Sequence, residues 1–132
     1  MTVFTDTSAF CAVFDRDDSN HDSARATWAR LLREAGTLLI TNYVLVETSA
    51  LFQHRLGVAA LRAFHEDVAP LVSVDWISEH RHRAGVDAAL AAARKKLSLV
   101  DCISFQTMRE RGVRTAFCFD AHFREQGFEV IP

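Results

Sequence analysis

The sequence predicts an α/β protein of three layers, in which helices cover both faces of a central parallel sheet of four to five strands. Short runs of β-branched and aromatic residues alternate with longer segments whose apolar residues recur at helical spacing. The run Thr115–Phe119 lacks apolar–polar alternation, which is typical of a strand that is covered on both faces. Helical crossovers between such strands give a parallel sheet with right-handed connections.

The predicted strands and helices can be placed in chain order. Strands are expected at Val3–Thr5, Leu38–Thr41, Leu71–Val74 and Thr115–Phe119, with a less distinct fifth strand at Glu129–Ile131. Helices are expected at Ala9–Asp15, along the stripe of Ala24, Trp28, Leu31, Leu32 and Ala35 that Gly36 ends, and at Tyr43–Leu56, Val58–Val68, Ser78–Leu97 and Leu99–Arg111. Helical segments thus separate the first four strands, as βαβ units require.

Length and composition set the broad class of the protein. With 132 residues, no repeat and no proline- or glycine-rich linker, the chain is expected to form one domain over 1–132. Its net charge of −2 excludes a protein that binds nucleic acid through bulk positive charge. The sequence has no signal-peptide pattern, no apolar run of about 20 residues and no CxxC pair. We therefore expect a reduced, cytoplasmic protein without a membrane segment.

Two aspartates stand at the ends of predicted strands. Asp6 directly follows Val3–Thr5, and Asp120 directly follows Thr115–Phe119. Functional groups in an open parallel sheet gather outside the carboxyl ends of the strands, so these two residues are candidates for a shared site. The alternative is that each aspartate only caps the helix that follows it.

Two further acids lie on apolar helix faces. Glu47 shares a stripe with Val44 and Leu51, and Asp101 points to the same side as Phe105. A carboxylate at such a position costs several kcal/mol unless it is paired or bound to a cation. The alternatives are structural: Glu47 would favour the dipole at the start of its helix or lie at the edge of the core, and Asp101 would complete a capping box with Ser98.

A divalent cation would explain all four acids together. Converging carboxylates repel one another and raise each other's pKa unless a cation neutralises them. Oxygen ligands select Mg²⁺ or Mn²⁺, whereas Zn²⁺ prefers Cys and His, and the chain has no HxxxH or CxxC spacing. The predicted metal ligands and catalytic residues are Asp6, Glu47, Asp101 and Asp120. Ser104, one turn after Asp101, is placed to hydrogen-bond it.

The order of these motifs resembles the PIN-domain nucleases, and most closely the VapC-type toxins of toxin–antitoxin pairs. The resemblance runs from Asp6 to Phe128 and rests on four motifs: Asp6-Thr7-Ser8, Asn42 to Glu47, Ser98 to Ser104 and Thr115 to Asp120. It implies that the first and fourth strands are neighbours and that the four acids hold divalent metal. It also implies that the hydroxyls of Ser8 and Ser104 orient these carboxylates. Some relatives carry a further acid where this chain has His122, which leaves the number of metal ions open.

The resemblance implies a Mg²⁺- or Mn²⁺-dependent endoribonuclease that leaves a 5′-phosphate and a 3′-hydroxyl. Arg94, Lys95 and Lys96 are candidates for contacts with RNA phosphates, although they also fit a solvated helix end. The expected partners are the RNA substrate, a cognate antitoxin and a second copy of the chain. The apolar residues of Tyr43–Leu56 and Val58–Val68 either form a contact surface for the antitoxin or the second copy, or belong to the core.

Two other functions remain possible from the residues alone. An aspartate-based phosphatase or phosphoacceptor would use Asp6, but such sites usually carry a second aspartate where this chain has Ser8. A catalytically silent PIN-like binding module typically loses some of the acids, and all four are present here. The small size, without an inserted arch, favours RNA over flapped DNA as the substrate. The residues do not identify which RNA is cleaved.

Overall fold

The computed structural model describes residues 1–34 and 36–132, and it confirms a parallel α/β sheet. These described residues form five strands, all parallel, in the spatial order β3-β2-β1-β4-β5. Their bounds are β1 Thr2–Thr5, β2 Thr37–Thr41, β3 Ser73–Asp75, β4 Thr115–Phe117 and β5 Glu129–Ile131. The less distinct fifth strand is therefore present, and β1 and β4 are neighbours as the family resemblance implied.

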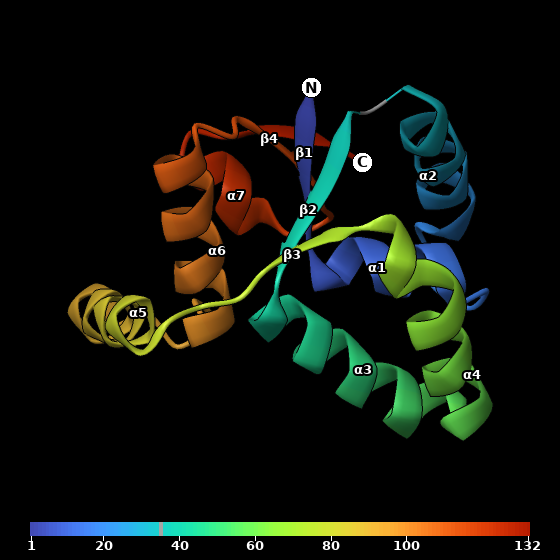
Figure 1. The fold of residues 1–132 in the computed structure, drawn as a ribbon, viewed down its shortest axis with the longest axis horizontal. Helices are drawn as coiled ribbons and strands as arrows, with labels where there is room; N and C mark the ends of the chain where they lie inside the picture. Colours follow the sequence, from blue (N-terminus) through green and yellow to red (C-terminus); the bar gives the residue numbers. More distant parts are fainter. Residues whose placement is uncertain (35) are drawn as a thin grey trace.

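Helices flank the sheet on both sides. Their bounds are α1 Thr7–Phe14, α2 His21–Glu34, α3 Asn42–Leu56, α4 Val58–Ala63, α5 Glu79–Ala92, α6 Leu99–Arg111 and α7 Ala121–Glu125. Figure 1 shows α5, α6 and α7 on one side of the strands and α1, α2 and α4 on the other, while α3 lies beyond the carboxyl ends of the strands. None of the helices in the described residues is both long and apolar enough to cross a bilayer.

Several element boundaries differ from the prediction. Leu71 belongs to a short 3-10 turn that contains Pro70, so β3 begins only at Ser73. The helix expected to reach Leu97 ends at Ala92, because Ala93 adopts a left-handed conformation with φ of 52°. The predicted helix Val58–Val68 changes from α to π geometry at Phe64. Ala35, the last residue of the predicted α2 stripe, lies outside the described residues.

The five-residue helix α7 was not predicted, since a segment this short carries little periodic signal. It packs Phe123 into the core, where the ring lies 5.0 Å from that of Phe105 on α6. The predicted strand Thr115–Phe119 is shorter than expected, because β4 ends at Phe117. The two residues that follow carry the chain from the sheet to Asp120, the N-cap of α7.

The register of the central strands positions the candidate site. Thr5 pairs with Phe117, so β1 and β4 end at the same edge of the sheet. The backbone N–H of Asp6 donates to the carbonyl of Phe117 at 3.1 Å, which extends this pairing by one step. The segments that carry Asp6 and Asp120 therefore leave the sheet side by side, at its carboxyl edge.

Candidate functional site

A cleft of about 410 Å³ opens at the carboxyl edge of the sheet. All four predicted acids line it, as do Ser8 and Lys96. The other lining residues are Thr7, Cys11, Asp18, Asn20, Leu51, Arg55, Ser98 and Phe119. The fold thus brings together carboxylates from the ends of β1 and β4 and from the helices α3 and α6.

Asp6 is the most deeply buried of the four acids, with 4% of its surface exposed. It caps α1 and accepts hydrogen bonds from the hydroxyl of Ser8 at 2.7 Å and from its backbone N–H at 3.2 Å. Burial raises the pKa of Asp6 to about 7; the two Ser8 bonds oppose this rise, and the charges of Asp101 and Glu47 add to it. Asp6 therefore caps α1, as the structural alternative predicted, and it also lines the cleft.

Glu47 lies on the second turn of α3 and is half-buried. Burial is the main cause that raises its pKa, and the nearby charges of Asp101 and Asp120 raise it further. A hydrogen bond from Thr7 acts in the opposite direction. Glu47 is therefore within electrostatic reach of the three other acids, as expected for carboxylates that share one site.

Asp101 combines two roles that the sequence left as alternatives. Its Oδ2 accepts from the backbone N–H of Ser98 at 3.2 Å, and its own N–H donates to the Ser98 hydroxyl at 3.0 Å. This reciprocal pair is the capping box at the start of α6. Asp101 is nevertheless 8% exposed and lines the cleft, where burial raises its pKa. One carboxylate oxygen therefore caps the helix while the other, Oδ1, has no hydrogen-bond donor among the described residues.

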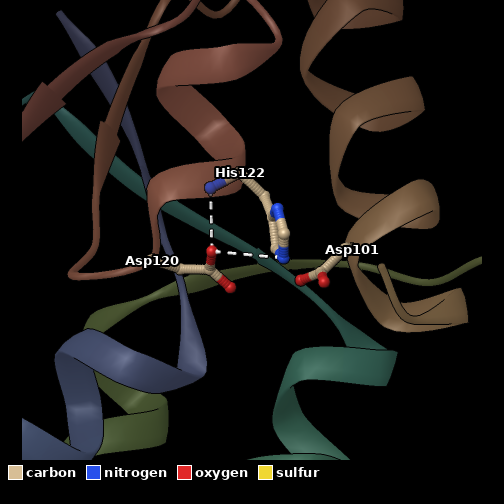
Figure 2. Close-up of side chains that lie close together, drawn as sticks. All are labelled: Asp101, Asp120 and His122. Carbon is tan, nitrogen blue, oxygen red and sulfur yellow. Dashed lines mark hydrogen bonds and ion pairs between the residues drawn. The ribbon is translucent and has the colours of Figure 1, made fainter. Parts of the chain in front are cut away.

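Asp120 caps α7 and lies next to His122. Its Oδ1 accepts from the backbone N–H of His122 at 2.8 Å and lies 3.9 Å from Nε2 of the same residue. Figure 2 shows the carboxylates of Asp120 and Asp101 on either side of the His122 ring. One ligand atom of each of these three residues lies within 4.8 Å of the others. A hydrogen bond with Glu125 is the main cause that raises the pKa of His122.

The two predicted orienting serines behave differently. The Ser8 hydroxyl donates to Asp6 and accepts from the backbone N–H of Phe119 at 3.0 Å, so it links the ends of β1 and β4. The Ser104 hydroxyl instead donates to the carbonyl of Val100 at 2.9 Å. The expected Ser104–Asp101 hydrogen bond is therefore wrong, because a serine inside a helix readily bonds the carbonyl four residues before it.

Of the three predicted phosphate contacts, Lys96 lines the cleft. Arg94 forms an ion pair with Glu125 at 3.2 Å, and Lys95 is exposed outside the cleft lining. Arg55, Asn20 and Asp18 also line the cleft and were not among the predicted site residues. Spacing could have revealed Arg55, since it stands on the helix face of Glu47, eight residues further along α3.

The residues in the cleft fit a divalent cation. Two atoms that bind one ion at about 2.1 Å lie at most about 4.2 Å apart, so the 4.8 Å group needs only a small movement to close on an ion. Asp6 and Glu47 add two more carboxylates in the same cleft. An oxygen-rich donor set of this kind suits Mg²⁺ or Mn²⁺.

The chain is similar to known proteins in both sequence and fold. The profile of the PIN domain matches residues 3–129. The "23S rRNA-specific endonuclease VapC20" of two Mycobacterium tuberculosis strains is 30% identical over 132 residues, which is 98% of either chain. Its crystal structure, described as a sarcin–ricin loop cleaving toxin, superposes with a TM-score of 0.86 over 98% of this chain and 99% of that one.

A more distant structure shares the fold. FitAcB from Neisseria gonorrhoeae superposes with a TM-score of 0.70, at 13% identity, over 100% of this chain and 97% of that chain. Together, the profile match over nearly the full length and the 30% identity over 98% of the chain establish the family. This chain belongs to the PIN domain family.

Proposed function

We propose that the protein is a divalent-metal-dependent endoribonuclease and the toxin of a VapBC-type toxin–antitoxin pair, which inhibits translation. The observation that carries this proposal is the convergence of Asp6, Glu47, Asp101 and Asp120 in one cleft of a PIN-domain chain. Bound Mg²⁺ or Mn²⁺ would supply an acidified water and would neutralise charge on the scissile phosphate. The four carboxylates would hold the ion, and the hydroxyl of Ser8 fixes the orientation of Asp6.

The proposed substrate is ribosomal RNA. The relative that is 30% identical over 98% of this chain is named as specific for 23S rRNA, and its solved structure is described as cleaving the sarcin–ricin loop. We therefore propose a stem-loop of this class as the first RNA to test, with products that end in a 5′-phosphate and a 3′-hydroxyl. Because the substrate is RNA, we propose the cytoplasm as the place of action.

RNA brings negative charge to an acidic cleft, so its phosphates need cations nearby. Lys96 and Arg55 both line the cleft. Neither takes part in the ion pairs found among the described residues. Arg55 is eight residues from Glu47, about 12 Å along the α3 axis. It therefore contacts a neighbouring phosphate rather than the scissile one, and Lys96 contacts the strand beside Asp101.

The proposed protein partners are a cognate antitoxin and a second copy of the chain. Of the apolar residues in the predicted contact segments, Val46, Leu56 and Val58 are exposed, by 66%, 39% and 60% respectively. Phe64 is buried in the core, as are Val44 and Phe52. Light scattering after gel filtration at micromolar concentration checks the dimer, and a monomer under these conditions would contradict it.

The cleavage test uses a synthetic sarcin–ricin stem-loop and a full 23S rRNA transcript, with Mg²⁺, Mn²⁺ or EDTA. The wild-type protein should cut in the presence of metal, and cleavage should stop with EDTA. Asp6→Asn and Asp101→Asn should lower kcat by about 100-fold or more, because they remove charge from the metal ligands. Asp87→Asn is the matched control, since Asp87 is an exposed acid of α5 that lies outside the cleft lining.

The outcomes separate this proposal from its alternatives. RNA that binds to the wild-type protein without being cut, with either metal, would indicate a silent binding module. Cleavage that survives both Asp6→Asn and Asp101→Asn would contradict the assigned site. Sequencing of the RNA ends identifies the cleaved bond. If the protein cuts an RNA other than ribosomal RNA, the proposed enzyme class stands and the proposed substrate is wrong.

A further inference from the structure

We propose that His122 is itself a metal ligand, through Nε2, and that it shifts the preference of the site from Mg²⁺ toward Mn²⁺. This inference rests on the metal site of the proposed function and adds a nitrogen donor to its carboxylates. Three observations support it: the closeness of the three ligand atoms, the orientation of the imidazole and the free carboxylate oxygen of Asp101.

The first observation is the position of the ring. The side chain of His122 is only 14% exposed and lies between the carboxylates of Asp120 and Asp101 (Figure 2). Its Nε2 is 3.9 Å from Asp120 Oδ1, a separation that is too long for a direct hydrogen bond. Two atoms that bind the same ion are separated by distances of this order. The gap therefore suits an ion that both atoms contact.

The second observation is the orientation of the ring. Nδ1 of His122 lies 3.3 Å from Glu125 Oε2, on the side away from Asp120. Arg94 contacts the same Glu125 oxygen at 3.2 and 3.3 Å and holds it in place. A histidine that binds metal usually donates its other ring N–H to a carboxylate in this way, which leaves the free nitrogen lone pair directed at the ion.

The third observation is the state of Asp101. Asp101 is buried. Of its two carboxylate oxygens, only Oδ2 accepts a hydrogen bond, from the backbone N–H of Ser98. Oδ1 accepts no hydrogen bond among the described residues, so it is free to contact a cation. Asp101, Asp120 and His122 form the 4.8 Å group, so a cation there could take this free oxygen as a ligand.

The nature of the donor sets the metal preference. Mg²⁺ is a hard ion that favours oxygen ligands and retains several waters, whereas imidazole suits transition metals. A site with one imidazole among carboxylates therefore gains affinity for Mn²⁺ relative to Mg²⁺. An aspartate at position 122 would remove this bias and provide the all-oxygen set that Mg²⁺ prefers.

The experiment measures metal binding directly, without RNA. Mn²⁺ is titrated into wild type, His122→Asp and the control His80→Asp at pH 8, and bound Mn²⁺ is examined by pulsed EPR for coupling to ¹⁴N. His80 is an exposed histidine of α5 outside the cleft lining, so the control makes the same substitution elsewhere. Competition titrations with Mg²⁺ give the ratio of the two dissociation constants. Thermal melts in EDTA establish that each variant is folded. If His122→Asp does not fold, His122→Gln replaces it.

Wild type and His80→Asp should show imidazole ¹⁴N coupling, and His122→Asp should lack it. The preference for Mn²⁺ over Mg²⁺ should fall about tenfold in His122→Asp. Glu125→Gln should keep the coupling and weaken Mn²⁺ binding by a smaller factor, because Glu125 only positions the ring. Mn²⁺ that binds the wild type without ¹⁴N coupling would overturn the role of His122 and leave the metal-dependent nuclease intact. A wild type that binds neither metal would overturn both.

Discussion

Single residues in this protein serve the fold and the candidate site at once. Asp6 and Asp120 cap the helices that follow them, and Asp101 completes a capping box, yet all three line the same cleft. A helix N-terminus supplies N–H donors that fix one carboxylate oxygen. In Asp6 and Asp101 the other oxygen is left without a hydrogen bond from the helix, whereas in Asp120 the capping oxygen itself also faces Nε2 of His122. Capping and metal binding are therefore compatible roles, and the first prepares the second.

Neutralising Asp6 should stabilise the metal-free protein while it abolishes activity. Asp6 is almost fully buried near Glu47 and Asp101, so its charge is unfavourable without a cation, and the amide of Asp6→Asn can still accept from Ser8. In EDTA at pH 7, the free energy of unfolding should rise by roughly 1–3 kcal/mol. Mg²⁺ should raise the Tm of wild type and have less effect on the variant. Asp87→Asn is the control, and a variant less stable than wild type would contradict the argument.

The two cations on the cleft walls should affect substrate binding more than the chemical step. Arg55→Gln and Lys96→Gln should each raise KM for the stem-loop RNA about three- to tenfold with kcat nearly unchanged. The salt dependence of RNA binding should also become shallower, because fewer phosphates are neutralised. The controls are Arg33→Gln, at the exposed end of α2, and Lys95→Gln, next to Lys96. Equal effects in variants and controls would contradict a specific role for the cleft walls.

Pairs of elements are held together by close local contacts, and the packing of α5 against α6 is one example. Gly85 is the buried residue of α5, and its backbone lies against Ile103 on α6. A Cβ at this position would lie 2.2 Å from Ile103 Cδ1 and 2.9 Å from Cγ1. Glycine therefore serves helix packing here, even though it weakens the helix by about 1 kcal/mol relative to alanine.

Gly85→Ala should destabilise the protein even though alanine is the better helix former. The clash with Ile103 costs about 1–3 kcal/mol, which outweighs the gain in helix propensity of about 1 kcal/mol. Ile103→Val removes the clashing Cδ1, so Gly85→Ala should be less harmful in that background. Urea unfolding of the four proteins in this cycle measures the coupling. If the effects of the two substitutions are additive, a side chain at position 85 does not clash with Ile103, and the close packing of α5 against α6 is contradicted.

The molecule as a whole is tied together by an ion-pair network at the edge of the sheet. Asp75, at the end of β3, accepts two bonds from Arg81 of α5, at 2.9 and 3.1 Å, and one from Arg111 of α6 at 2.9 Å. Arg81 also donates to Thr107 of α6 at 2.9 Å. The network therefore joins the edge strand to both helices that cover it. The side chain of Asp75 is only 13% exposed, so water screens these contacts weakly.

This network should make stability depend on pH in the acid range. The hydrogen bond from Arg81 is the main cause that lowers the pKa of Asp75. Because the folded pKa lies below the unfolded value of about 3.9, the stabilisation is present above that pH and is lost as the pH falls through the folded pKa. Asp75→Asn should therefore cost roughly 1–3 kcal/mol between pH 5 and 8, and the difference from wild type should shrink below about pH 4.

Urea unfolding across this pH range measures the effect of Asp75→Asn. Glu79→Gln is the matched control, since Glu79 pairs with Arg83 but both side chains are more than 70% exposed, at 78% and 74%. Glu79→Gln should change the free energy of unfolding by less than about 1 kcal/mol at every pH. Equal effects of the two substitutions would contradict the role assigned to the buried network.

The sequence alone determined the parallel α/β class, the positions of most elements and the four acids of the cleft. These features depend on local patterns: strand and helix periodicity, and acids at strand ends or on apolar faces. Leu97 and Phe119 were assigned to elements that end earlier, and α7 was missed, because element ends depend on single backbone conformations that periodicity does not report.

Only the tertiary structure decided what the side chains contact. It placed Arg55, Asn20 and His122 beside the acids, paired Arg94 with Glu125, and directed the Ser104 hydroxyl to Val100 instead of Asp101. These contacts join segments that are far apart in the chain or depend on a choice between nearby acceptors. The spacing of residues in the sequence indicates which of them share one face of a helix or strand. Which faces of different elements come into contact depends on the packing of the whole chain. That is why the four acids, Ser8 and Lys96 could be named from the sequence, whereas most of the other residues around them could not.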